Sequence, residues 1–171
     1  GSFHQPKFVL SDVQNLQSLP TRDLTAGWAE AIKHSLILDL PSLSTFEQKA
    51  ESIQSIEPDS TTAIIKRSVA TKANIVSQDE KETAGIRALL NYGHTIGHAL
   101  ESVTNYSSLL HGEAVSIGMS GAGYISNQIG ILTEDELARQ QNVLQRYGLP
   151  SSFKNIRIEE VLSAMKSDKK T

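Results

Sequence analysis

Two histidines four residues apart, His94 and His98, are the first residues in this sequence whose types and spacing could do chemistry. On an α-helix this spacing places both imidazoles on one face, where they can bind a metal ion together. A lone helical histidine is more often structural than a ligand, and the pair also occurs by chance. His111 starts the next expected helix, so a tight helical hairpin would return a third imidazole to the pair. These residues indicate a metal site, and a structural role stays open.

The two histidines belong to a longer line of polar residues. Its members follow one another at gaps of four, three, four and three residues: Arg87, Asn91, His94, His98 and Glu101. A solvent-facing helix favours Lys and Glu, whereas Asn and His are poorer helix formers with more versatile chemistry. Gly93 and Gly97 lie in the same segment and each cost up to about 1 kcal/mol relative to Ala inside a helix. We therefore predict a helix from about residue 84 to 103. Its glycines lower helix stability but let a neighbouring backbone or a ligand come close.

The sequence contains no cysteine among its 171 residues. Disulfides and thiolate metal sites are therefore excluded, and His with Asp or Glu remains the strong ligand set for a transition metal. Sixteen basic and nineteen acidic residues give a net charge of -3, so we expect neither nucleic acid nor an anionic membrane as a partner. No apolar run approaches the roughly 18 residues that span a bilayer, and no leader opens the chain. We expect a soluble, cytoplasmic protein.

Apolar residues at helical spacing predict the elements that must position these side chains. With Thr21 as N-cap, the first helix runs to about residue 39, and its apolar face consists of Leu24, Trp28, Ile32 and Leu36. Another helix follows Pro41. A third starts near residue 59, with a buried face of Ile65, Val69, Ala73 and Val76. Further helices are expected at about 84–103, 111–128, 133–147 and 158–166.

The run from Phe8 to Leu10 predicts a short strand stub that belongs to a sheet upstream. One strand cannot make a sheet, and the sequence shows neither repeats nor a long linker. We therefore predict an all-α fold class, with one multi-helix domain over residues 1–171 and the strand stub at its N-terminus.

The earlier helices carry further candidates. Glu30, Lys33 and His34 lie away from the apolar face of the first helix, where a solvated Glu-Lys pair is the alternative. Lys72 borders the expected buried face of its helix, so its stem can be covered while its ammonium reaches a cleft. The default interpretation of the charge run at 79–82 is a solvated turn, and that of the run at 168–170 is a frayed basic end.

Several stretches together resemble the 3-dehydroquinate synthase family of the shikimate pathway, which leads to the aromatic amino acids. They occur in order along the whole chain: residues 1–7, Leu19-Pro20, Gly27-Trp-Ala-Glu-Ala-Ile-Lys33, Lys72-Ala73, 79–82, Arg87 to His98, His111-Gly-Glu-Ala-Val115, Gly148-Leu-Pro150 and 168–170. The block Asn-x-Gly-His-x-x-Gly-His with His-Gly-Glu-Ala-Val is highly specific to this family and its close relatives.

The resemblance implies a lyase that converts 3-deoxy-arabino-heptulosonate 7-phosphate to 3-dehydroquinate and phosphate, with transient oxidation by NAD. It implies that Zn2+, with Co2+ as a possible substitute, is held by Glu30, His94 and His111. His98 then becomes a catalytic or substrate-contacting residue rather than a fourth ligand. Three protein ligands leave coordination positions open, which suits a catalytic zinc.

By the same resemblance, other residues line the substrate and NAD sites. Lys33 and Lys72 would act beside His98, and the substrate would contact Arg87, Asn91, Glu82 and Lys169 or Lys170. The segment Asn15, Leu16, Gln17 and Ser18 would touch NAD, with Ser18 in place of a more usual Thr. The stretch from Glu82 to Arg87 is one residue longer than the family spacing, and Trp28 stands where smaller apolar residues are common.

The family has an N-terminal NAD-binding domain before its helical metal domain, and no Gly-rich phosphate loop precedes the metal motifs here. We therefore expect this chain to be the C-terminal half, inactive alone, from an enzyme that forms a homodimer. A related sugar phosphate cyclase that makes an inosose or valiolone is an alternative, although Asn91 and His98 favour dehydroquinate. An iron-containing alcohol dehydrogenase does not match the metal pattern. A non-catalytic helical metal-binding or assembly module is the alternative of another class.

Overall fold

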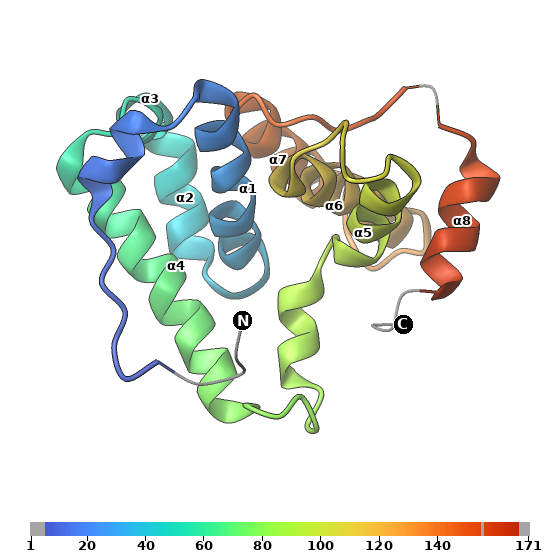
Figure 1. Cartoon of the computed structure of the whole chain (residues 1–171), viewed down its shortest axis with the longest axis horizontal. Coiled ribbons are helices and arrows are strands. Elements are labelled where there is room, and N and C mark those ends of the chain that lie inside the picture. The colour runs from blue at the N-terminus through green and yellow to red at the C-terminus, as the bar shows by residue number, and fades with distance from the viewer. Residues whose placement is uncertain (1–5, 155, 168–171) are drawn as a thin grey trace.

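A computed structural model describes residues 6–154 and 156–167 of the chain (Figure 1). The described residues form helices and no β-strand, which confirms the all-α fold class. In chain order the elements are the 3-10 helix η1 (Val13–Ser18), α1 (Thr21–Leu38), α2 (Leu40–Gln48), α3 (Ala50–Gln54), α4 (Pro58–Gln78), the 3-10 helix η2 (Ile86–Asn91), α5 (His94–Val103), α6 (His111–Gln128), α7 (Glu134–Arg146) and α8 (Ile158–Ser167). Among them, no helix has the length and apolar character needed to cross a membrane.

Helix α1 lies at the centre of the fold and packs against α2, α4, α6 and α7. Its expected apolar face lies in or against the core, where Trp28 contacts Phe46 and Tyr147 edge to face at ring-centroid distances of 6.4 and 6.3 Å. The Tyr147 hydroxyl donates to the backbone carbonyl of Phe46 at 3.1 Å, so this buried polar group is satisfied. Because α1 has neighbours on several sides, its polar face is covered as well.

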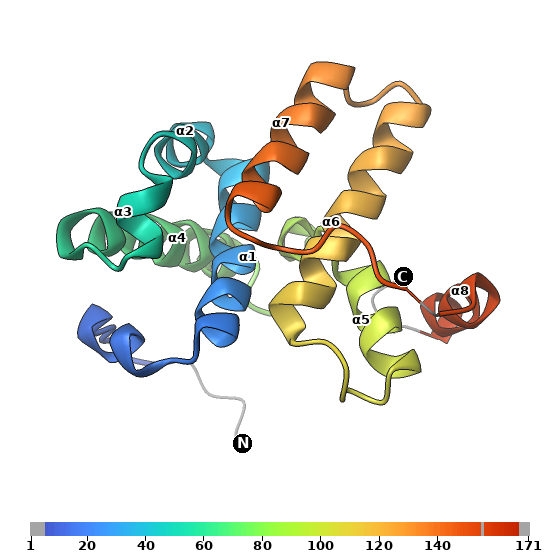
Figure 2. The same ribbon diagram turned by 90° about the horizontal axis from the view of Figure 1, so that it is seen from above.

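Helices α5 and α6 form the expected hairpin, and α8 lies beside α5 on the outer side (Figure 2). The backbones at the centre of this arrangement approach closely. A Cβ on Gly112 of α6 would lie 1.9 Å from the carbonyl oxygen of Ala26 in α1. A Cβ on Gly118 would lie 1.9 Å from the carbonyl oxygen of Gly93. Glycine at these two positions lets α6 pack against both α1 and the start of α5.

The predicted continuous helix from 84 to 103 is wrong, because the chain breaks before His94. Residues 86–91 form η2, and Gly93 adopts φ 78° as the residue before α5. Asp79 accepts hydrogen bonds from the backbone nitrogens of Thr83, Ala84 and Arg87. These bonds hold the loop between α4 and η2 in place. The five-residue polar line is therefore divided: two members lie on η2 and three on α5.

Three smaller expectations also differ. Pro20, rather than Thr21, caps α1, with its carbonyl accepting from the Leu24 nitrogen. Residues 8–10 form no strand because no described segment pairs with them. The expected buried face of α4 is displaced: its buried residues are Ser60, Thr61, Ile64 and Ile75, and Val69 is 43% exposed.

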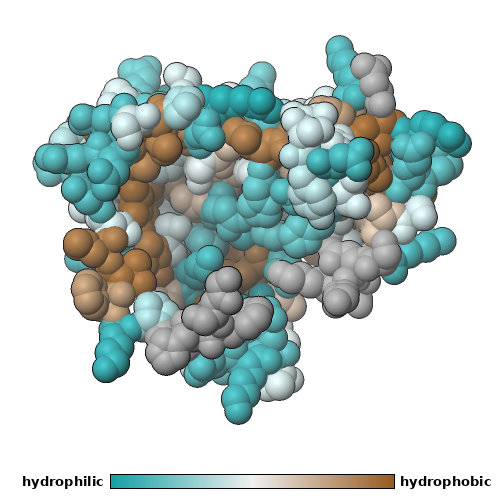
Figure 3. All heavy atoms as spheres, in the orientation of Figure 1, coloured by the Kyte–Doolittle hydropathy of each residue, from teal (hydrophilic) through white to brown (hydrophobic). Residues whose placement is uncertain are grey.

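The difference in α4 has a simple cause, because the second half of the helix runs beyond α1 and α2 (Figure 1). Val69 of this helix is exposed, and so are the apolar residues 8–10 near the start of the chain. Figure 3 shows hydrophobic surface on the left side of this face, over these two segments.

Candidate metal centre and active site

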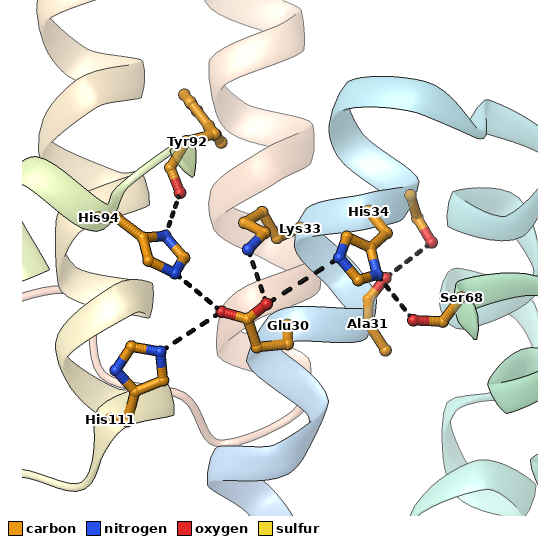
Figure 4. Close-up of polar contacts among 9 residues, drawn as sticks. Glu30, Ala31, Lys33, His34, Ser68, Tyr92, His94 and His111 are labelled. Carbon is orange, nitrogen blue, oxygen red and sulfur yellow. Dashed lines mark hydrogen bonds and ion pairs between the residues drawn. The ribbon is translucent and has the colours of Figure 1, made fainter. Parts of the chain in front are cut away.

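Three side chains from three helices converge at the centre of the molecule: Glu30 of α1, His94 of α5 and His111 of α6 (Figure 4). We call them the metal triad. One ligand atom from each lies within 4.8 Å of the other two. The Glu30 Oε1 atom is 3.2 Å from Nε2 of His94 and 3.6 Å from Nε2 of His111. The structure thus brings together the three residues expected to bind zinc.

The donor set of the metal triad fits a divalent cation. Oε1 of Glu30 is buried and has no hydrogen-bond partner among the described residues. Burial raises the pKa of Glu30, but hydrogen bonds from His111 and His94 when these rings are protonated, together with the Lys33 ammonium, outweigh burial and hold the pKa well below its usual range. A buried carboxylate oxygen facing two imidazole nitrogens is a ligand set that zinc accepts.

The orientation of His94 also favours a cation at this point. Its Nδ1 atom lies 3.2 Å from the backbone carbonyl oxygen of Tyr92. A carbonyl only accepts hydrogen bonds, so Nδ1 carries the proton and Nε2 presents its lone pair to Glu30. Two electron-rich atoms 3.2 Å apart repel each other unless a cation lies between them or a proton is added. The geometry therefore provides a reason for a metal ion as well as room for one.

Lys33 and His34 contact the other oxygen of the Glu30 carboxylate (Figure 4). The Lys33 ammonium donates to Oε2 at 2.6 Å, and the residue is only 1% exposed. A solvated Glu-Lys pair is therefore the wrong description, because α1 is covered on this side too. With Oε2 engaged by Lys33, Oε1 remains directed at the two histidines.

His34 is a buried neighbour of the metal triad. Its Nδ1 atom lies 2.8 Å from the Ser68 hydroxyl on α4, and its Nε2 atom lies 4.0 Å from Oε2 of Glu30. Burial and the charges of Lys33 and Lys72 together lower the pKa of His34 to about 4, against the opposing effect of the Glu30 carboxylate. His34 is therefore neutral at neutral pH, and the exposed Lys72 lies near enough to influence its pKa.

His98 lies one helical turn after His94 and faces the same region. Its ring centroid is 5.3 Å from that of His94 and 6.1 Å from that of His111, and it stacks on the latter at an interplanar angle of 28°. His98, Glu101 and His111 form a second group whose possible ligand atoms lie within 4.8 Å of one another. His98 thus lies beside the metal triad.

Glu101 is the residue that sequence reasoning missed. It is the last member of the line of polar residues in the sequence, but the sequence analysis predicts no function for it. In the structure it is 8% exposed, and its Oε1 atom lies 3.0 Å from Nδ1 of His111. The carboxylates of Glu30 and Glu101 together raise the pKa of His111. The seven-residue spacing from His94 was the available signal, since it places Glu101 two helical turns along the same face.

The structure places other expected substrate residues on the segment between α4 and α5, which includes η2. Arg87 donates to the backbone carbonyl of Glu80 at 2.9 Å, and its Nε atom is 3.5 Å from a Glu82 carboxylate oxygen. Asn91 is half-buried at the end of η2. Lys169 and Lys170 lie outside the described residues.

The expected NAD-contacting residues 15–18 lie in η1 at the surface. The Ser18 hydroxyl donates to the backbone carbonyl of Asn15 at 2.8 Å. Leu16 lines a hollow of about 210 Å³ that extends to Glu30 of the metal triad and Ser68 of α4. One residue of the expected nucleotide-contacting segment, Leu16, and one member of the metal triad, Glu30, thus line the same recess.

Comparison with known proteins places these features in a family context. A family model described as 3-dehydroquinate synthase C-terminal matches residues 27–171. The 3-dehydroquinate synthase of a Picosynechococcus species is 45% identical in an alignment of 173 positions, which covers 99% of this chain and 47% of that protein. Its counterpart in a Prochlorococcus marinus strain is 45% identical in an alignment of 172 positions, which covers 99% of this chain and 46% of that protein. The chain therefore spans about half the length of these relatives.

A solved structure has a similar fold. It is a 2-epi-5-epi-valiolone synthase from Streptomyces hygroscopicus with NAD+ and Zn2+ bound. The two chains are 26% identical with a TM-score of 0.82, and the match covers 91% of this chain and 43% of the other.

Proposed function

The chain belongs to the 3-dehydroquinate synthase family, and from that premise we propose that it forms the zinc- and substrate-binding half of a 3-dehydroquinate synthase. The complete enzyme would convert 3-deoxy-arabino-heptulosonate 7-phosphate to 3-dehydroquinate and phosphate, as a carbon-oxygen lyase of the shikimate pathway. The convergence of Glu30, His94 and His111 is the observation that carries the proposal. The zinc in the related valiolone synthase supports it.

Glu30, His94 and His111 would hold the metal, with Co2+ as a possible substitute. When bound, zinc supplies a Lewis acid that polarises substrate oxygens. Lys33 keeps one oxygen of the Glu30 carboxylate occupied, so the other faces the metal position. Neutral His34 limits the positive charge on the α4 side of the carboxylate.

The substrate is a polyanion, and the cations around the site match it. Lys72 on α4 and Arg87 on η2 would pair with its phosphate and carboxylate, and Asn91 would donate to or accept from a hydroxyl. His98 lies beside the metal triad at a ring distance of 5.3 Å from His94, where it can exchange a proton with bound substrate. Binding the phosphate and the ring together would orient the reacting carbons.

NAD would come from a nucleotide-binding half of the complete protein, with residues 15–18 of η1 contacting it. The hollow shared by Leu16 and Glu30 supports this placement. In the complete enzyme we also propose a cytoplasmic homodimer. When bound, the nucleotide would supply the transient oxidation of the substrate.

A valiolone-type sugar phosphate cyclase is the second candidate, favoured by the likeness in fold to the valiolone synthase. The 45% identity to a dehydroquinate synthase against 26% to the valiolone synthase supports the first assignment. The test is phosphate release by the complete protein with NAD and zinc. We expect release from 3-deoxy-arabino-heptulosonate 7-phosphate; release only from the substrate of valiolone synthase would overturn the assignment.

A further inference from the structure

We propose that Glu101 is a positioning residue for the metal triad, which fixes the tautomer and ring orientation of His111 so that Nε2 faces the metal. This inference deepens the proposed function and rests on it. Glu101 would touch neither metal nor substrate and would act only through His111.

The contact between the two side chains determines which nitrogen carries the proton. Oε1 of Glu101 lies 3.0 Å from Nδ1 of His111. A carboxylate accepts hydrogen bonds and donates none, so Nδ1 is the protonated nitrogen. Nε2 then keeps its lone pair, and it is this atom that lies 3.6 Å from Oε1 of Glu30. A histidine ligand whose other nitrogen donates to a carboxylate is both oriented and made more basic.

His111 needs this support more than His94 does. The His94 side chain is 10% exposed, and its Nδ1 atom is held by a backbone carbonyl that no substitution removes. The His111 side chain is 49% exposed and occupies the first position of α6, where the chain has just left a loop. The two histidines reach the same tautomer by different means, and only that of His111 depends on another side chain.

The fold explains why Glu101 reaches this ring. It lies on the same face of α5 as His94, two turns further along, and its side chain is 10% exposed. Helices α5 and α6 approach closely here, since a Cβ on Gly97 would lie 3.2 Å from the carbonyl oxygen of Ala114. Helix α5 thus provides one expected ligand and the hydrogen-bond partner of another.

The start of α6 is held separately from this contact. Glu113 accepts from the Leu110 backbone nitrogen at 2.8 Å and from Arg22 of α1 at 2.7 Å. Arg22 also donates to the Ser108 carbonyl at 3.0 Å. The backbone of His111 is therefore anchored by Glu113, while its ring is oriented by Glu101. This separation offers a matched pair of glutamates for an experiment.

A competing arrangement uses the same atoms. His98, Glu101 and His111 could themselves hold a cation, in which case Glu101 is a ligand. With Nδ1, the atom 3.0 Å from Glu101, as the ligand atom of His111, that arrangement requires Nδ1 to lose its proton, whereas the positioning role requires Nδ1 to keep it. The tautomer of His111 consequently distinguishes the two.

The experiment measures Zn2+ affinity by chelator competition and the His111 tautomer by long-range 15N-1H NMR, on the chain and on Glu101→Ala, Glu101→Gln and Glu113→Gln. NMR is recorded with and without zinc at alkaline pH, where the imidazoles are neutral. We expect protonated Nδ1 in the unmodified chain. For Glu101→Ala we expect a mixed tautomer and a zinc affinity about 10- to 100-fold lower. Glu101→Gln should lose less zinc affinity, because its amide oxygen can still accept the hydrogen bond from Nδ1 of His111.

Glu113→Gln is the control: it should lower the melting temperature and leave the tautomer and zinc affinity close to those of the unmodified chain. Unchanged affinity and tautomer in Glu101→Ala would overturn the positioning role, as would deprotonated Nδ1 in the zinc-loaded chain. If the unmodified chain binds no zinc, the proposed function fails, while the tautomer of the metal-free chain and of Glu101→Ala still decides whether Glu101 orients His111.

Discussion

The metal triad and the segment from Asp79 to Asn91 are built by different means. The triad residues come from three packed helices, and glycines at the helix contacts hold the backbones close together. The Asp79 segment is a loop and a 3-10 helix tied mainly by hydrogen bonds to one carboxylate. A metal ion requires ligand atoms at well-defined positions, whereas a long cationic side chain can reach an anion from a range of backbone positions. The two regions should therefore respond differently to substitution.

The largest effect is expected from Gly118→Ala. Its Cβ would lie 1.9 Å from the Gly93 carbonyl oxygen, directly before His94, so the start of α5 must move. We expect a loss of about 3 kcal/mol in unfolding free energy, together with weaker zinc binding. Chemical denaturation and zinc titration measure the two effects.

Gly27→Ala in α1 is the matched control, since nothing lies within 4 Å of the added Cβ. It should stabilise the chain by up to about 1 kcal/mol through helix propensity. Equal stability changes in both variants would contradict the role given to close helix packing.

An intermediate effect is expected from Ser68→Ala, which removes the partner of His34 Nδ1. A buried nitrogen left without its partner costs about 1–3 kcal/mol, measured by denaturation. Ser77→Ala on the same helix is the control, because Ser77 is exposed and its hydroxyl donates to the nearby Asn74 carbonyl. A cost no greater than that of the control would show that the His34 contact does not stabilise the fold.

His34 also predicts a pH dependence. Its folded pKa of about 4 lies below the ordinary value of 6.5, so the unfolded chain binds more protons between these values. The contribution of neutral His34 is therefore fully present above pH 6.5 and is lost as the pH falls towards 4. Melting temperatures across this range should fall less steeply for His34→Gln than for the unmodified chain.

The smallest effect is expected from Asp79→Asn in the other region. Backbone hydrogen bonds, the strongest from Ala84, hold the pKa of Asp79 below its ordinary value of 3.8. Its stabilisation is thus present above that pH and lost as the pH falls further. The variant should lose part of this acid dependence and bind substrate analogues more weakly, with zinc affinity unchanged. Loss of zinc affinity in calorimetry would show that the two regions are not independent.

Particular residues show how far sequence reasoning reaches. The helix at 111–128 and the apolar face around Trp28 follow from periodicity, and the structure has both. Periodicity placed Glu30 away from the core face, and only the family resemblance made it a ligand. The break at Gly93 escaped prediction because the apolar pattern continues across it. Burial of Lys33 could not be foreseen without knowing that α1 is surrounded.

Spacing placed Glu101 on the same face as His94, but its contact with His111 could not be predicted from spacing alone. It depends on how the loop from 104 to 110 returns α6 onto α5, and spacing within one helix carries no information about that return. Local patterns predict which residues share a face, while contacts between helices depend on close approaches such as those at Gly97 and Gly118.

The most direct test of the metal triad is a calorimetric zinc titration of the chain, His94→Ala and His98→Ala. The two histidines lie on one helix with ring centroids 5.3 Å apart, so the variants are matched in surroundings. We expect one zinc bound by the unmodified chain, loss of binding in His94→Ala and retained binding in His98→Ala. Equal loss in both variants, or no binding by the unmodified chain, would contradict the assignment of Glu30, His94 and His111 as the zinc ligands.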